Sequence, residues 1–392
     1  MKEKNIDIDF NRFSKMITLE KIVFLILLVI IFSYEFHALW LLYDILALGS
    51  ILFFIKQLNY KLITILIISV IFFISMSIIS GSHIISFLSI WDNLKHVFPM
   101  FMLFSIAERY MHQPRMNNFL SLFGWALFFI FLLQMCLVFF QYYLGYYYDD
   151  ISGTFGVAGS HSICYFCLMY IAYLLYVKRS YFTTLIVFII SLIMNYFSEN
   201  MGFYPLVILL ISLNWLSFKK FKYLFIYGIS FIIIVFLLDL ALNGQILKPI
   251  IYRFSEFLSP PEFKAEKLTP SRGFMSILAF LLGGFFGAGP GCFSHIYSIE
   301  PWLSIEPIQI DISSFTIIVA EYGLVGMLFW LMIFGFFLAR FFSSKKYFIF
   351  VFSFFIFCFL YNKILNDERI FIMFLFTLFS IKCYTEKYRK IL

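Results

Sequence analysis

An arginine at the start of an expected helix is the residue in this chain best suited to bind an anionic group. In "KLTPSRGFMSILAFLLGG", Thr269 can cap a helix, Pro270 suits its first position and Arg272 falls in its first turn. A guanidinium there offers a bidentate fork beside unpaired backbone N–H groups, which suits a diphosphate. The alternative is an interfacial arginine that extends towards lipid headgroups.

Two residues further along the chain could accept a proton from a hydroxyl group. Asp311 directly precedes an apolar run, and a carboxylate at that position can act as a general base or can cap the helix that follows. The two interpretations of Asp311 carry equal weight. His295 is the second candidate for the base, because its ordinary pKa lies near neutrality.

Glycines and one buried acid accompany these residues. The stretch "GGFFGAGPGCF" contains Gly283, Gly289 and Gly291 and predicts a turn with close backbone approach. It lacks the spacing and the Lys-Ser/Thr pair of a nucleotide loop. Glu321 lies about ten residues beyond Asp311, at membrane depth, where an acid is paired or functional. We favour a structural pairing for Glu321, and we expect Gly323 and Gly326 to allow close helix packing.

A second polar segment, "YYYDDISGTFGVAGSHSICYF", combines aromatic, acidic and glycine residues. Such a loop suits a sugar, because aromatic rings stack on pyranose faces while Asp150 and His161 bind hydroxyl groups. Alternatively, Tyr146–Tyr148 belong to an interfacial aromatic belt and His161 only caps a helix. Both alternatives remain open at the level of sequence.

The elements that must position these residues are transmembrane helices. The chain has 392 residues, of which 62% are hydrophobic and only 13% charged, whereas soluble domains carry about a quarter charged residues. This composition excludes a soluble enzyme, a disordered chain and a disulfide-stapled module. Apolar runs long enough to span a membrane predict twelve helices, at 21–38, 40–55, 62–80, 86–107, 119–143, 161–177, 181–197, 203–218, 223–241, 314–338, 347–362 and 369–383.

The distribution of basic residues sets the expected orientation. Most of the 29 Lys and Arg fall in the termini and in alternate loops, so both termini are expected to be cytoplasmic. We expect one transmembrane domain over residues 1–392, with a large extracytoplasmic loop at 242–313 between the ninth and tenth helices. Topology accounts for the net charge of +7, which therefore requires no nucleic acid partner. We expect neither a metal nor a cofactor.

These motifs together resemble the Wzy-type O-antigen and capsular polysaccharide polymerases, which are related to the O-antigen ligases. The family pattern of Arg, ten residues and Gly matches Arg272 and Gly283, and "G-x-G-P-G-x-F" matches residues 287–293. "E-Y-G-L-x-G" matches residues 321–326, and "G-T-F-G" matches residues 153–156. Ligases carry a His-Asn pair where this chain has Ile312 and Ser313, a difference that favours the polymerases. The family often has an Arg before Gly-Thr-Phe, and Arg253 is our candidate for that second cation.

The resemblance implies an all-helical, GT-C-like membrane glycosyltransferase, inverting and metal-independent, in a bacterial plasma (inner) membrane. Its substrates would be oligosaccharide repeat units linked to undecaprenyl diphosphate, polymerised at the outer face for lipopolysaccharide or capsule. Its partners would be membrane lipids and possible companions such as a chain-length regulator and a flippase. The alternatives are an O-antigen ligase and a polysaccharide or lipid transporter. Transporters usually contain internal repeats and broken helices, whereas the helices of this sequence are expected to be mostly unbroken.

Overall fold

The computed structural model shows a helical protein. It describes residues 60–79, 114–156, 159–200, 202–216, 262–264, 267–269, 272–290, 313–342, 345–362 and 367–389, together with residues 44–45, 48, 91, 95–96 and 364–365. The chain divides into two compact units, each described below by itself. The first comprises Met1–Leu62, Lys95–Pro205 and Glu368–Leu392, and the second comprises Ile63–Leu94 and Leu206–Asp367.

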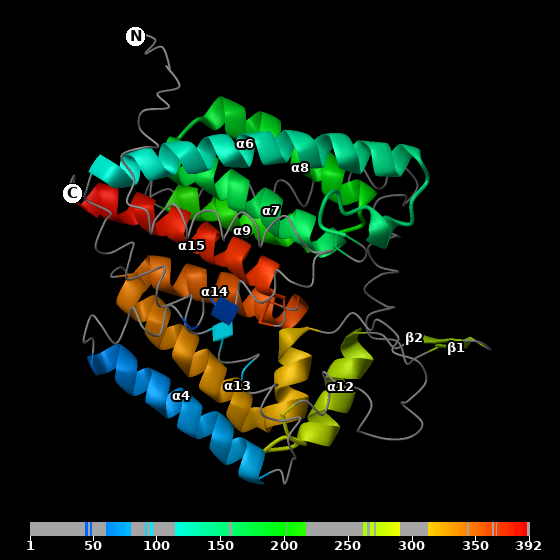
Figure 1. Cartoon of the computed structure of the whole chain (residues 1–392), viewed down its shortest axis with the longest axis vertical. Coiled ribbons are helices and arrows are strands. Elements are labelled where there is room, and N and C mark those ends of the chain that lie inside the picture. The colour runs from blue at the N-terminus through cyan, green and yellow to red at the C-terminus, as the bar shows by residue number, and fades with distance from the viewer. Residues whose placement is uncertain are drawn as a thin grey trace. The chain divides into compact units, whose positions relative to one another are not determined.

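Helices account for nearly all of the described secondary structure, apart from one short hairpin (Figure 1). The helices are α4 (Tyr60–Ile79), α6 (Pro114–Tyr143), η2 (Tyr148–Asp150), α7 (Ser160–Ala172), η3 (Tyr173–Lys178), α8 (Tyr181–Phe197), α9 (Phe203–Leu216), α12 (Arg272–Gly283), α13 (Ser314–Phe341), α14 (Lys345–Tyr361) and α15 (Glu368–Arg389). Strands β1 (Glu262–Lys264) and β2 (Lys267–Thr269) pair in antiparallel orientation.

Among the residues that the structure describes, three helical segments are long and apolar enough to cross a membrane: Leu120–Tyr143, Ser160–Lys178 and Ser314–Ala339. The chain is therefore a membrane-embedded helical protein. The helices α4, α6, α7, α8, α9, α13, α14 and α15 coincide with spans expected from the sequence. The count of twelve spans stays a prediction, because several of the expected spans lie outside the described residues.

The first unit is built on α7, which packs against α15 and α6 (Figure 1). Both sides of α7 are buried, as expected for a central helix in a membrane bundle. The ring of Phe123 on α6 stacks on Phe376 of α15, with centroids 4.8 Å apart. The hydroxyl of Tyr173 donates to the Leu120 carbonyl over 2.7 Å, which ties η3 to α6.

In the second unit, α13 packs against both α12 and α14. Phe73 of α4 lies edge-on to Tyr322, and its neighbour Phe72 stacks on Phe329 with centroids 3.8 Å apart. The first turn of α13 is held by the segment that follows α14, because the Ser314 N–H donates to the Asn362 carbonyl over 3.0 Å. These contacts surround the middle of α13 with aromatic side chains.

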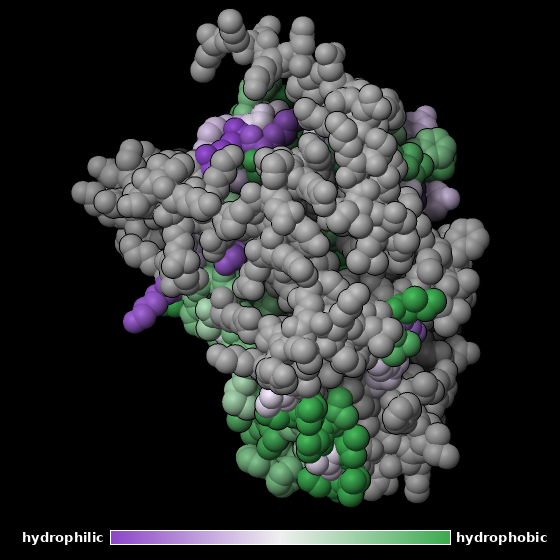
Figure 2. Space-filling view, turned by 60° about the vertical axis from the view of Figure 1, so that its left-hand side comes forward, coloured by the Kyte–Doolittle hydropathy of each residue, from purple (hydrophilic) through white to green (hydrophobic). Residues whose placement is uncertain are grey.

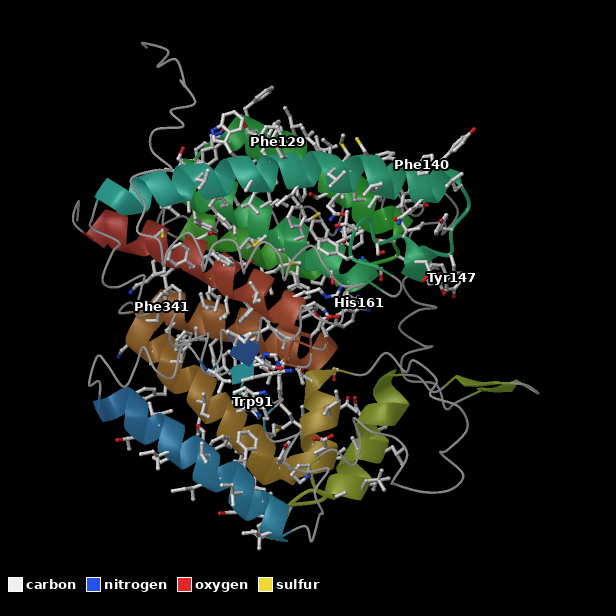
Figure 3. The ribbon with its side chains drawn as sticks, in the orientation of Figure 1. Trp91, Phe129, Phe140, Tyr147, His161 and Phe341 are labelled. Atoms are coloured by element: carbon white, nitrogen blue, oxygen red, sulfur yellow. The ribbon has the colours of Figure 1, made fainter. Side chains whose placement is uncertain are left out.

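The exposed faces of several helices are strongly apolar. Along α4 the isoleucines Ile67, Ile71, Ile74 and Ile78 are all exposed. Figure 2 shows apolar surface in the lower part of that view. On α6, Phe129 and Phe140 point outwards (Figure 3). Such faces are typical of helices that contact lipid.

The start of α12 differs from the sequence expectation. Thr269 does not cap this helix, because it ends β2 and pairs with Glu262 of β1. The helix begins at Arg272, which therefore still occupies the first turn. With 12 residues, α12 is about 18 Å long and cannot span a hydrocarbon core of about 30 Å.

Candidate functional site

The most unusual backbone feature of the second unit is a break within α13. At Gly323 the dihedral angles are φ 65° and ψ −164°, which are far from helical values. Figure 1 shows the ribbon of α13 turning sharply along its course. The expectation that the helices are mostly unbroken is therefore wrong for this one. Helix breaks at membrane depth require another source of hydrogen bonds for the freed backbone groups.

The glycine-rich turn after α12 supplies those hydrogen bonds. The carbonyls of Ala320 and Glu321 accept from the N–H groups of Ala288 and Gly289, over 2.8 and 3.0 Å. On the other side of the break, the N–H groups of Leu324 and Val325 donate to the carbonyls at positions 284 and 285, both over 3.2 Å. We call this contact between residues 283–289 and 319–325 the junction.

Glycine is required on both sides of the junction. A Cβ atom at Gly323 would overlap with the Phe285 carbonyl and would lie 2.6 Å from the Gly287 nitrogen. A Cβ at Gly287 would overlap with the Glu321 carbonyl. Both glycines also have positive φ, which side chains disfavour. The "G-x-G-P-G" and "E-Y-G" motifs are thus two halves of one backbone contact.

The same contact continues along α12. A Cβ at Gly283 would overlap with the Val319 carbonyl, so the helices approach through backbone atoms. Closer to the start of α12, the hydroxyl of Ser276 lies 3.0 Å from that of Thr316, which is 2.9 Å from the Ser313 hydroxyl. Ser313 caps α13 by accepting from the Thr316 N–H, so the alternative interpretation of Asp311 as the cap of this helix is wrong. The end of α12 that carries Arg272 is therefore held beside the start of α13.

Three further expectations concern residues within the junction. Gly289 has φ 116° and donates its N–H to the Glu321 carbonyl, so its predicted role in close backbone approach is confirmed. Glu321 is buried, as expected for an acid at membrane depth. Gly323 and Gly326 do allow close contacts, but with the turn and with Tyr322 of the same chain segment, not with a neighbouring helix.

The polar loop of the first unit, residues 150–161, is held by two glutamines of α6. The Gln141 side-chain oxygen accepts from the N–H groups of Ser152 and Gly153, over 3.0 and 2.8 Å. Its amide nitrogen donates to the Gly153 carbonyl over 3.1 Å. Gln134, which is fully buried, accepts from the Thr154 N–H over 3.0 Å. The side chain of Gln134 also contacts the Thr154 hydroxyl.

Two more side chains reach this loop from distant parts of the chain. Arg369, near the start of α15, donates from Nη1 to the Phe155 carbonyl over 2.7 Å. Asn200 donates to the Ser160 carbonyl over 2.6 Å and holds the first residue of α7. Sequence analysis missed both residues. It also missed Gln134 and Gln141, although two amides seven residues apart share one face of an apolar span.

The two residues expected to bind hydroxyl groups flank this loop. Asp150 ends η2, and His161 is the second residue of α7; both are partly exposed. Figure 3 shows His161 and Tyr147 at the same end of α6 and α7. Tyr147 is exposed and its ring lies against that of Tyr148, so these tyrosines present aromatic surface beside the loop. Asp150 and His161 thus flank described residues whose backbone is held by side chains of other elements, namely residues 152–155 and Ser160.

Several predicted site residues lie outside the described residues: Asp311, His295, Arg253 and Gly291. Arg253 was the candidate for a cation beside the "G-T-F-G" motif, and the structure has Arg369 bound to that motif. Among the residues that the structure describes, no group of three or more His, Cys, Asp or Glu could hold a metal ion.

Comparison with models of known protein families finds no match to this chain, and comparison with curated proteins finds no significant match either.

Proposed function

We propose that this protein is a membrane polysaccharide polymerase. It transfers a growing glycan from undecaprenyl diphosphate to a lipid-linked repeat unit at the outer face of a bacterial plasma membrane. The transition state of this reaction needs positive charge at the departing diphosphate and a base near the acceptor hydroxyl. Arginine side chains can supply the charge, so the reaction needs no metal.

The junction is the observation that carries this proposal. The Arg272–Gly283 segment and the "G-x-G-P-G" turn are consecutive in the sequence, the "E-Y-G" motif begins only at Glu321, and the three together carry the resemblance to the polymerase family. In the structure, residues 284–289 are hydrogen-bonded to residues 320–325. Residues from different segments that act at one reacting centre must be held in a fixed geometry. Hydrogen bonds between the segments provide such a support.

The proposed roles follow from the position of each residue. Arg272, in the first turn of α12, binds the diphosphate together with the N–H groups of that turn. Gly283 and Gly289 allow the backbone approach that holds α12 against α13. In the first unit, Asp150 and His161 bind hydroxyl groups of the acceptor sugar. Asp311 is the proposed base, and His295 is its alternative.

A transporter is the second candidate, because a broken helix with a buried acid is typical of transporters. In transporters, however, the unwound carbonyls are used to coordinate ions or substrate. Here the carbonyls of Ala320 and Glu321 already accept hydrogen bonds from Ala288 and Gly289. The break is therefore closed by the protein itself, which favours a structural support for a catalytic site.

The decisive experiment is reconstitution of the purified protein with a lipid-linked repeat unit. The wild type should produce a ladder of polymers and release undecaprenyl diphosphate. Arg272→Lys keeps the charge but loses the bidentate fork, so we expect a rate lower by about 100-fold, which corresponds to roughly 3 kcal/mol. Full-length polymer from Arg272→Ala would eliminate this role. Transport of an intact lipid-linked unit without polymer would favour the transporter.

The role of Asp311 is tested in the same assay. Asn has the size and polarity of Asp, but it cannot act as the base that accepts the proton. We therefore expect Asp311→Asn to form folded protein at the normal level and to lose polymerisation. If Asp311→Asn polymerises at the wild-type rate, Asp311 is not the base, and His295→Gln becomes the next variant to measure.

A further inference from the structure

Arg369 is a buried cation that donates a hydrogen bond to the backbone of a distant loop. It is the second residue of α15 and is 8% exposed. Its Nη1 atom donates over 2.7 Å to the carbonyl of Phe155, which is itself fully buried. Burial of a guanidinium is unfavourable unless the charge is hydrogen-bonded. The contact with Phe155 is therefore a strong constraint on the position of that carbonyl.

Arg369 and the glutamines attach the loop to different helices. Gln134 and Gln141 hold Ser152, Gly153 and Thr154 to α6. Arg369 holds the next residue to α15, which packs against α7. The loop is thus attached to two helices, α6 and α15. Loss of the Arg369 contact removes the attachment to α15, while the glutamines still hold the loop to α6.

We infer that Arg369 is a positioning residue, which sets the geometry of the 150–161 loop and thereby of Asp150 and His161. Because its side chain is buried, Arg369 acts through the Phe155 carbonyl and does not touch the substrate. The consequence for catalysis rests on the proposed function: Arg369 determines how well the acceptor sugar binds, and it leaves the binding of the donor diphosphate unchanged.

The positioning role itself is tested without an activity measurement. Hydrogen exchange of the purified protein is followed in peptides that cover residues 152–156. We expect Arg369→Met to raise amide exchange in this segment by about tenfold. Lys382→Met is the matched control, because Lys382 is also a buried cation of α15 and lies towards its other end. Unchanged exchange in folded Arg369→Met would overturn the inference.

The catalytic consequence is tested with substrates that separate the two roles. A lipid-linked glycan blocked at its own acceptor hydroxyl can only donate, and a repeat unit on a tail without diphosphate can only accept. We expect Arg369→Met to raise the KM for the acceptor about tenfold and to leave the KM for the donor at the wild-type value. Arg369→Lys, which keeps a charged donor, should restore most of the acceptor affinity.

A double-mutant cycle with Gln141→Leu completes the test. If both side chains act through the same loop, their effects on the KM for the acceptor are non-additive. Additive effects, or equal changes in donor and acceptor kinetics, would overturn the positioning role. If Arg369→Met does not accumulate, Arg369→Gln replaces it, and an unchanged KM for the acceptor then overturns the inference. Absence of glycan transfer by the wild type contradicts the proposed function, while the exchange measurement still decides the role of Arg369.

Discussion

The junction of the second unit and the 150–161 loop of the first are held in opposite ways. At the junction, backbone groups bond to backbone groups, and a Cβ atom at Gly283, Gly287 or Gly323 would overlap with a facing backbone carbonyl. In the loop, the backbone groups bond to long polar side chains of Gln134, Gln141 and Arg369. The junction is therefore sensitive to side chains added at these three glycines, whereas the loop depends on side chains that a truncation would remove.

The two regions are therefore expected to be sensitive to different kinds of substitution. Alanine scanning, which truncates side chains, removes no atoms from a glycine. It would therefore not detect the glycine contacts of the junction. Insertion of a methyl group would detect the junction at once. Both regions satisfy buried backbone groups, which is the strict requirement on non-helical backbone within a membrane. They differ only in where the partner groups come from.

The largest effect should come from Gly323→Ala. The added Cβ would overlap with the Phe285 carbonyl, and alanine disfavours φ 65°. Backbone strain and overpacking together should destabilise the protein by about 3–5 kcal/mol. We expect the purified variant to unfold at a much lower temperature than the wild type. Gly335→Ala is the control on the same helix, because its Cβ would meet nothing closer than Phe352 at 3.7 Å. Normal unfolding of Gly323→Ala would contradict the described junction.

A smaller effect should follow from removal of a side chain in the loop. Gln134→Leu keeps the volume of the side chain but leaves the partly buried N–H of Thr154 without its side-chain acceptor. Loss of this hydrogen bond costs about 1–3 kcal/mol, so we expect a lower unfolding temperature and weaker acceptor binding. The neighbour Leu133 is exposed, and Leu133→Met should behave as the wild type. Equal stability of both variants would show that the glutamine is not the support of the loop.

The smallest effect should come from a side chain beside the junction, in the contact between α12 and α13. Ser276→Ala removes a hydroxyl that lies 3.0 Å from Thr316, but Thr316 keeps its contact with Ser313. The loss should be about 1 kcal/mol or less, measured as a small shift in the unfolding midpoint. A loss comparable to that of Gly323→Ala would remove the contrast between the two regions, because side chains would then support the junction as strongly as backbone does.

Local patterns in the sequence were enough to predict most helices. Long apolar runs predicted α4, α6, α7, α8, α9, α13, α14 and α15, because a helix in lipid must satisfy its backbone within one segment. The residues around Arg272 likewise predicted the start of a helix there, which is α12. The polar loops and the glycine motifs were also visible, since both depart from the apolar background. What the helices pack against was not visible, because every span is similarly apolar.

The details that depend on distant partners escaped the sequence. Thr269 appeared to be a helix cap, but it pairs with Glu262 in a hairpin. Gly323 appeared to be a helix-packing residue, but its φ of 65° breaks the helix, and the break persists only because the turn at 284–289 supplies the missing hydrogen bonds. The glutamines of α6 were detectable as polar residues in an apolar span, although their partners in the loop were not.

The sequence by itself determined that the chain is a helical membrane protein and which segments carry its polar chemistry, because hydrophobicity and residue type are local properties. Only the tertiary structure decided that residues 283–289 close the break at Gly323, and that Arg369 binds the carbonyl of Phe155. These contacts join positions tens to hundreds of residues apart. They depend on the backbone geometry of both partners, which no pattern within either segment encodes.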